Sequence, residues 1–168
     1  VSVEAYAWSP TQDRLAYTTG SDELVTLYAG SAELFALAAR PVLTPSSPGQ
    51  VGRFAWSPDG NWLAYEWRGI TAPTHQSLWR LSANGQQQAA LYLDNLGKQG
   101  DLLLAGWSGS GKSVIFWQSE AITPTEFASL YAVSAERDAT QGISLTKLSL
   151  EEMLAYSDFY AAAPPGAG

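Results

Sequence analysis

The chain has 168 residues, of which 46 % are apolar and 15 % charged, a balance that excludes a disordered chain and allows one domain with a sizeable core. Its net charge of −7 argues against nucleic acid or an anionic membrane surface as a partner, because phosphate groups are bound by clustered Lys and Arg. The absence of cysteine excludes disulfides, thiol nucleophiles and thiolate metal sites, and no apolar run is long enough to cross a membrane.

A ten-residue frame stands near the start of the chain and occurs three times. Trp8–Tyr17 returns as Trp56–Tyr65 and as Trp107–Phe116, without gaps and at intervals of roughly 50 residues. The middle copy contains Ser-Pro-Asp-Gly, in which proline presets φ and glycine tolerates a positive φ, so each copy is predicted to be a strand, a tight turn and a second strand.

A second landmark follows each frame in the same order. Its copies are Thr26–Ala32, Ser77–Ala83 and Ser129–Ala135. Two landmarks at a fixed order and period define a structural repeat. The predicted units are residues 1–49, 50–100 and 101–149, followed by a C-terminal extension or linker at 150–168.

Each unit is predicted to form four short strands. In the first unit these are Glu4–Trp8, Arg14–Thr18, Leu24–Tyr28 and Leu34–Leu37. In the second they are Val51–Trp56, Trp62–Arg68, Ser77–Leu81 and Gln88–Leu93, with Asn84-Gly85 as the turn before the last strand. In the third they are Leu102–Trp107, Val114–Gln118, Ser129–Val133 and Ile143–Leu148.

The segments between and after the units lack this pattern. Pro41–Gly49 and Asn95–Asp101 are predicted to be loops between units. Ser149 can cap a short helix over Ser149–Tyr156, in whose first turn Glu151 and Glu152 favour the helix dipole. Pro164–Gly168 has the composition of a linker.

Four antiparallel strands in a repeat of this length are typical of a β-propeller blade, so the predicted fold is all-β with about three blades. The sequence resembles the TolB-like repeat family, whose repeats carry Trp-Ser-Pro-Asp-Gly followed by Leu-Ala-Tyr or Leu-Ala-Phe. Trp56–Tyr65 matches that pattern fully. Trp8–Tyr17 has Thr-Gln in place of Asp-Gly, and Trp107–Phe116 lacks the proline and the aspartate. The resemblance covers roughly residues 3–148 and implies a fold rather than an activity.

Two features of the frame are physical requirements of that fold. The residue before each tryptophan is small (Ala7, Ala55 or Gly106), which lets neighbouring sheets approach closely. Gln12 stands where the sister frames have Gly60 and Gly111, so a positive φ at that position would strain it by about 1 kcal/mol.

Three blades do not close a ring, since propellers typically have four to eight. We expect the remaining blades to come from a longer parent chain, because the sequence begins at Val1 and not at Met and ends in a linker-like segment. The alternatives are that two copies close a six-bladed ring as a homodimer, or that the exposed blades pack against a partner protein.

Two patterns suggest chemistry at first sight. Gly106–Ser113 satisfies the P-loop pattern, but the strand-forming residues after Ser113 predict a hairpin where a P-loop needs a helix. The one histidine, His75, has no cysteine or second histidine with which to bind zinc, and no nucleophile elbow accompanies it. Asp59 is predicted to be a turn residue, so no catalytic residue, metal site or cofactor is predicted.

The connection between the second and third strands is the candidate binding feature. It is short in the first unit and longer in the other two, where both copies contain Ile-Thr and Pro-Thr. Equivalent loops project from one end of a propeller, which predicts a recognition rim with Trp67, Arg68, His75 and Phe127 at its base. The alternative is that these loops are only longer hairpin connections.

The predicted function is a non-catalytic propeller segment that binds or scaffolds another protein. The alternatives are an accessory domain of a serine peptidase-like enzyme, which the family resemblance implies, and a propeller that binds a small molecule or carbohydrate through tryptophan and tyrosine. The resemblance to a bacterial family and the lack of cysteine favour a periplasmic or extracellular location over a cytoplasmic one. No membrane insertion of this segment is predicted.

Overall fold

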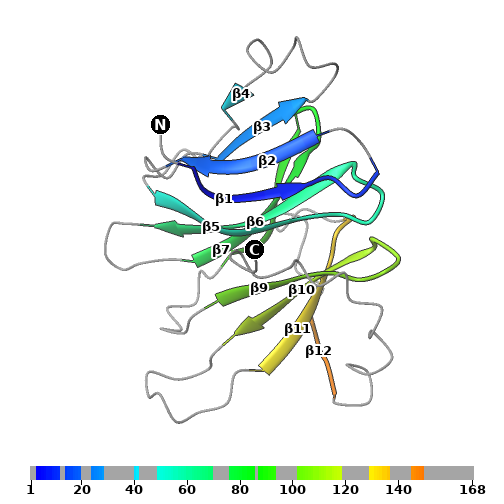
Figure 1. The fold of residues 1–168 in the computed structure, drawn as a ribbon. Coiled ribbons are helices and arrows are strands. Elements are labelled where there is room, and N and C mark those ends of the chain that lie inside the picture. The colour runs from blue at the N-terminus through cyan, green and yellow to red at the C-terminus, as the bar shows by residue number, and fades with distance from the viewer. Residues whose placement is uncertain are drawn as a thin grey trace.

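The computed structural model describes residues 3–11, 14–19, 24–28, 40–41, 49–69, 76–85, 87–93, 102–118, 129–136 and 145–149 (Figure 1). All regular structure in these residues is antiparallel β-sheet, in three sheets of four strands. The predicted fold class is therefore confirmed. No helix among the described residues is long and apolar enough to span a membrane.

Each sheet is a meander in which consecutive strands pair, and we call the sheets blades 1, 2 and 3. Blade 1 contains β1 (Val3–Trp8), β2 (Arg14–Thr19), β3 (Leu24–Tyr28) and β4 (Arg40–Pro41). Blade 2 contains β5 (Gly49–Trp56), β6 (Trp62–Gly69), β7 (Gln76–Ser82) and β8 (Gln88–Leu93). Blade 3 contains β9 (Leu102–Trp107), β10 (Ser113–Gln118), β11 (Ser129–Ser134) and β12 (Leu145–Lys147).

Most predicted strands agree with these bounds to within two residues. The exception is the fourth strand of blade 1, where β4 lies after the predicted Leu34–Leu37. Residues 34–37, Gln12 and the predicted helix after Ser149 lie outside the described residues.

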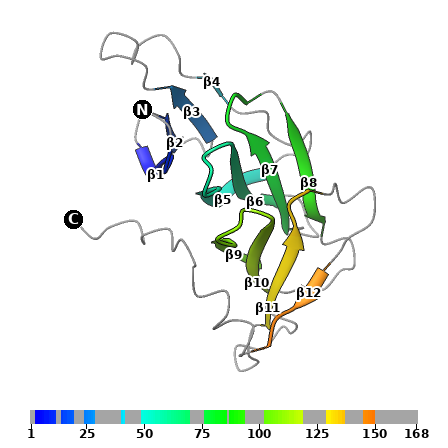
Figure 2. The same cartoon turned by 90° about the vertical axis from the view of Figure 1, so that its right-hand side faces the viewer.

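The blades are stacked face to face (Figure 1). In the perpendicular view β1, β5 and β9 lie along one side of the stack, and β4, β8 and β12 lie toward the other (Figure 2). The first strands of the three blades therefore share one edge of the stack, and the fourth strands lie toward the opposite edge.

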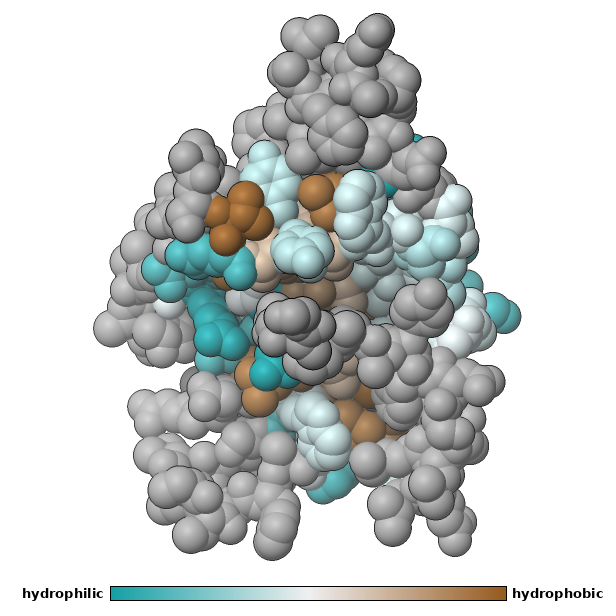
Figure 3. Space-filling model, viewed as in Figure 1, coloured by the Kyte–Doolittle hydropathy of each residue, from teal (hydrophilic) through white to brown (hydrophobic). Residues whose placement is uncertain are grey.

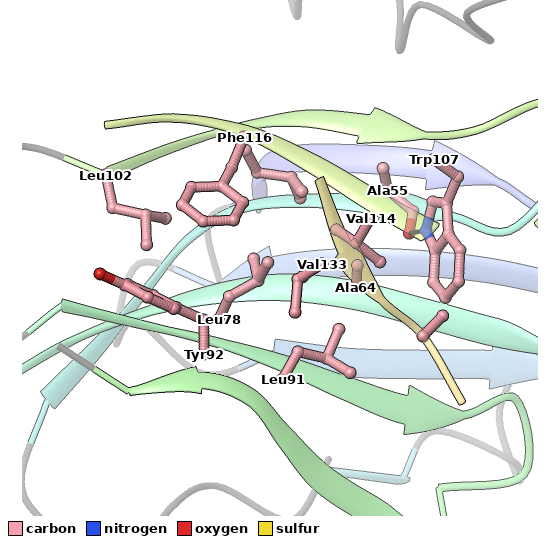
Figure 4. Packing of buried hydrophobic residues seen from close by; sticks show 12 residues of the cluster. Ala55, Ala64, Leu78, Leu91, Tyr92, Leu102, Trp107, Val114, Phe116 and Val133 are labelled. Carbon is pink, nitrogen blue, oxygen red and sulfur yellow. Dashed lines mark hydrogen bonds between the residues drawn. The ribbon is translucent and has the colours of Figure 1, made fainter. Parts of the chain in front are cut away.

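Two apolar clusters fill the spaces between blades. The cluster between blades 2 and 3 consists of Ala55, Ala64, Leu78, Leu91, Tyr92, Leu102, Leu104, Trp107, Val114, Phe116, Val133 and Ala135 (Figure 4). The cluster between blades 1 and 2 includes Ala16, Phe54, Trp56, Leu63, Tyr65, Trp67 and Leu81. Residues 63–67 of β6 are buried on both faces of the strand, which explains why all of them except Glu66 are apolar.

The tight turns are built around a serine and a glycine three residues apart. Gly60 N donates to Ser57 O over 2.9 Å, and Gly111 N donates to Ser108 O over 2.8 Å. Gly60 and Gly111 have φ of 69° and 70°, which confirms the requirement for a positive φ inferred from the sequence. The same device closes the turn after β7, where Gly85 N donates to Ser82 O.

Candidate functional site

The predicted rim residues Trp67 and Arg68 lie at the end of β6, whereas His75 and Phe127 lie outside the described residues. Trp67 is only 6 % exposed and belongs to the cluster between blades 1 and 2. Its ring lies against the backbone of Gly49, where a Cβ would come within 2.6 Å of it. The Arg68 side chain is 43 % exposed. Of these two residues, Arg68 is therefore the one that a partner can reach.

The described strand ends bring the bases of the two long connections together. Arg68 pairs with Gln76 across the end of blade 2, and Gln118 pairs with Ser129 across the end of blade 3. Gln76 Oε1 accepts a hydrogen bond of 2.6 Å from Leu102 N of the neighbouring blade. The strand ends at Arg68 and Gln76 in blade 2 and at Gln118 and Ser129 in blade 3 therefore lie at the same end of the stack.

Beside this end lies a buried carboxylate. Glu66 is 1 % exposed and is the only charged residue that is buried among those the structure describes. Its Oε1 accepts from Leu104 N of blade 3 over 2.5 Å. Its Oε2 accepts from Arg53 N over 3.1 Å and from Arg68 Nη2 over 2.8 Å. Both oxygens are thus bonded, and the side chain joins blades 2 and 3.

The local sequence explains why a carboxylate fits here. The register between β5 and β6 shifts between Val51 and Phe54, so the bulge frees Arg53 N from the ladder. The Glu66 carboxylate accepts the hydrogen bond that Arg53 N no longer gives to the neighbouring strand. A Cβ at Gly52 would lie 2.3 Å from Glu66 Oε2, so only glycine leaves room for the carboxylate. These four residues form one unit, which we call the Glu66 clasp (Gly52, Arg53, Glu66 and Arg68).

Other polar contacts at the same blade boundary reinforce the clasp. Tyr92 OH donates to Gln118 Oε1 over 3.1 Å. Arg80 donates to the carbonyl of Ala135 in blade 3 and lies 4.6 Å from the centre of the Trp62 ring. Since these bonds join adjacent blades, their evident role is to fix the blades against each other.

The sequence reasoning missed Glu66. It interrupts an otherwise apolar run between Tyr65 and Trp67, and its repeat-equivalents are Thr18 and Trp117. A charged residue at one copy of a strand position that is uncharged in the other copies is the signal that could have found it.

The apparent P-loop is the hairpin between β9 and β10, as predicted. Ser113 begins a strand, so the helix that a P-loop requires is not there. Ser113 N donates to Ser108 Oγ over 3.1 Å, which matches the bond from Trp62 N to Ser57 Oγ in blade 2. The motif is therefore a copy of the structural turn.

The titratable groups with shifted pKa values are structural as well. Burial raises the pKa of Tyr65 far above its ordinary value, against the effect of a hydrogen bond that its hydroxyl accepts from Gln88. At Asp59 burial acts to raise the pKa, but bonds from Ser57 Oγ and from Asn61 outweigh it and lower the pKa. Within the described ranges, no three His, Cys, Asp or Glu side chains are grouped so that they could hold a metal ion.

Comparison with known proteins gives a likeness of fold. No family model and no curated protein matches the sequence. Prolyl oligopeptidase B from Galerina marginata is similar to 86 % of this chain at 15 % identity, with a TM-score of 0.59. A structure from a study of two prolyl endopeptidases is similar to 88 % of it at 20 % identity, with a TM-score of 0.55. Hydrazine synthase of Kuenenia stuttgartiensis also has a TM-score of 0.55, at 12 % identity over 86 % of this chain.

The likeness to the peptidases is to their β-propeller domains. The chain spans about a fifth of each peptidase, 21 % and 22 %, and 41 % of the hydrazine synthase chain. At these identities the likeness shows the fold alone, and the resemblance to the TolB-like family stays a prediction.

Proposed function

We propose that this chain is a non-catalytic β-propeller segment that binds or scaffolds another protein through one end of its blades. The observation that carries the proposal is the convergence of strand ends around Arg68, Gln76 and Gln118. Binding residues are commonly carried on loops held by a rigid scaffold. The Glu66 clasp and Gln76 supply that rigidity, because they tie the ends of blades 2 and 3 together.

The burial of Trp67 changes which residues should carry binding. A core tryptophan cannot be removed without cost to the fold, so Trp67 supports the rim and does not contact the partner. The contact residues of the proposal are Arg68, His75 and Phe127.

The test uses the full polypeptide as bait in an extract of its own cells, with quantitative mass spectrometry as the readout. A His75→Ala, Phe127→Ala double variant should lose the protein that the wild type enriches. Lys112→Ala is the matched control, because Lys112 is exposed in the turn between β9 and β10, at the far end of β10 from Gln118. Equal enrichment by the double variant and the wild type would refute the rim as the binding surface.

The likeness to the propeller domains of two peptidases supports a second candidate, an accessory domain of a serine peptidase-like enzyme. The two candidates differ in the full polypeptide. A fluorophosphonate probe, which reacts with activated serines, should label the full polypeptide if an α/β-hydrolase domain accompanies the propeller. A polypeptide that lacks such a domain and takes up no probe would leave the binding segment as the better candidate.

A further inference from the structure

Four positions recur on the same face of every blade. They are two cross-strand pairs between the first and second strands: Phe54 opposite Tyr65 and Trp56 opposite Leu63 in blade 2, and Leu104 opposite Phe116 and Trp107 opposite Val114 in blade 3. All eight of these side chains are buried. The register gives Tyr6 opposite Tyr17 and Trp8 opposite Leu15 as the same positions of blade 1.

In blade 1 this face is exposed. Trp8 is 53 % exposed, against 6 % for Trp56 and 1 % for Trp107, and Tyr6 is 67 % exposed. Leu15 and Tyr17 are partly exposed. Brown and pale side chains appear on the surface over β1 and β2 (Figure 3). The apolar positions that are buried in blades 2 and 3 are thus left uncovered in blade 1.

The two covered faces show what fits against this set. Trp56 Nε1 donates to the carbonyl of Ala7 in blade 1 over 3.0 Å, and Trp107 Nε1 donates to that of Ala55 in blade 2 over 2.9 Å (Figure 4). Each acceptor belongs to a cross-strand alanine pair, Ala7 with Ala16 or Ala55 with Ala64. The indole therefore lies over two small residues and bonds to the backbone of the preceding blade.

We propose that the Tyr6, Trp8, Leu15 and Tyr17 face is the seat of a further blade of the same polypeptide. That blade presents a pair of small residues in its first two strands, and the carbonyl of the first one accepts a hydrogen bond from Trp8 Nε1. The seat continues the two blade contacts already described, and it is a different surface from the rim. The inference does not depend on the proposed binding function.

A second copy of this chain is a poor fit to the seat. If two copies closed a ring, the seat would meet the outer face of blade 3 of the other copy, where the pair is Gly106 with Ile115, so a bulky side chain stands where the other blades have alanine. Ile115 and Leu130 on that face are also buried already. Docking there would need a larger gap under the indole than either observed contact has.

The test is hydroxyl-radical footprinting of the full polypeptide, with mass spectrometry reporting oxidation at each tryptophan. We expect Trp8 to be oxidised about as slowly as Trp56 and Trp107, roughly tenfold slower than in the urea-unfolded protein, as for a side chain whose exposure has fallen from 53 % to near 6 %. Oxidation of Trp8 at nearly the unfolded rate would overturn the proposal. Protection that disappears on dilution would also overturn it, because it would assign the seat to a second molecule.

The hydrogen bond has a separate test in the same polypeptide. Trp8→Phe keeps an aromatic ring and removes the N–H, and Trp56→Phe and Trp107→Phe are its matched controls. All three variants should lower the melting temperature by a similar amount, about 2–4 °C. A melting temperature unchanged by Trp8→Phe but lowered by both controls would show that no carbonyl accepts from Trp8.

Discussion

Trp8, Trp56 and Trp107 stand in the same frame of the same repeat, yet their side chains are 53 %, 6 % and 1 % exposed. The strand, the preceding small residue and the following serine are common to all three. The difference is the neighbour: Trp56 and Trp107 each have an adjacent blade with an alanine carbonyl to accept their N–H. The same local sequence thus gives a core residue or a surface residue according to what lies beside the blade.

The largest loss of stability should come from removing a tryptophan side chain that is buried between two blades. Trp107→Ala leaves a cavity between blades 2 and 3 and should lower the free energy of unfolding by about 3–5 kcal/mol. Trp8→Ala removes a half-exposed side chain and should change it by less than about 0.5 kcal/mol in the 168-residue chain. Urea unfolding measures both. Equal losses would mean that Trp8 is covered in solution.

The second effect tests the Glu66 clasp, which joins blade 2 to blade 3. Glu66→Gln turns an N–H₂ group toward Arg53 N or Leu104 N, which leaves a buried donor without an acceptor. The free energy of unfolding should fall by about 1–3 kcal/mol. Glu136→Gln, at an exposed residue of the same charge, is the control and should have almost no effect. A loss no greater than that of the control would mean that the clasp contributes nothing to blade packing.

A smaller effect separates turn geometry from blade contact. Gly60, Gly85 and Gly111 share a φ near +70°, so alanine at any of them should cost about 1 kcal/mol. A Cβ at Gly60 would also lie 2.3 Å from Thr11 Oγ1 and 2.5 Å from Ser9 Oγ of blade 1, whereas Gly85 has nothing within 4 Å. Gly60→Ala should therefore unfold at a lower urea concentration than Gly85→Ala or Gly111→Ala. Three equal urea midpoints would mean that the Ser9 and Thr11 side chains of blade 1 move aside for the added methyl group without cost in stability.

The three blades and most of their strands could be predicted from the sequence. The spacing of the frames predicted the blades, because an intrinsic turn preference at Ser57–Gly60 and its copies is a local property. The strand bounds followed from apolar runs between turns. In blade 1 the described fourth strand, β4, lies after the predicted residues 34–37, and its two residues carry little pattern that could reveal it.

The site was less predictable because its geometry depends on contacts between blades. Trp67 and Arg68 are adjacent in sequence and were predicted together at the rim, but Trp67 packs in the cluster between blades 1 and 2, whereas Arg68 lies nearer the end of β6 and is half-exposed. Glu66 acquires its role only when the bulge at Gly52 and Arg53 and the edge of β9 lie beside it. Neither neighbour is visible in the local sequence.

The smallest effect compares the turns of blades 2 and 3 by their response to acid. Asp59 accepts from Ser57 Oγ over 2.5 Å and from Asn61 N over 3.0 Å, while Ser110, which does not titrate, takes its place in blade 3. Because its pKa in the folded protein is lowered, the charged form of Asp59 stabilises the fold above its ordinary pKa of 3.8. That stabilisation is lost as the pH falls through the lowered pKa. Asp59→Asn should therefore be less stable than the wild type near neutral pH, and the gap between their urea midpoints should narrow as the pH falls from about 6 to about 2. A gap that stays constant over that range would show that Asp59 acts in the turn through its shape and not through its charge.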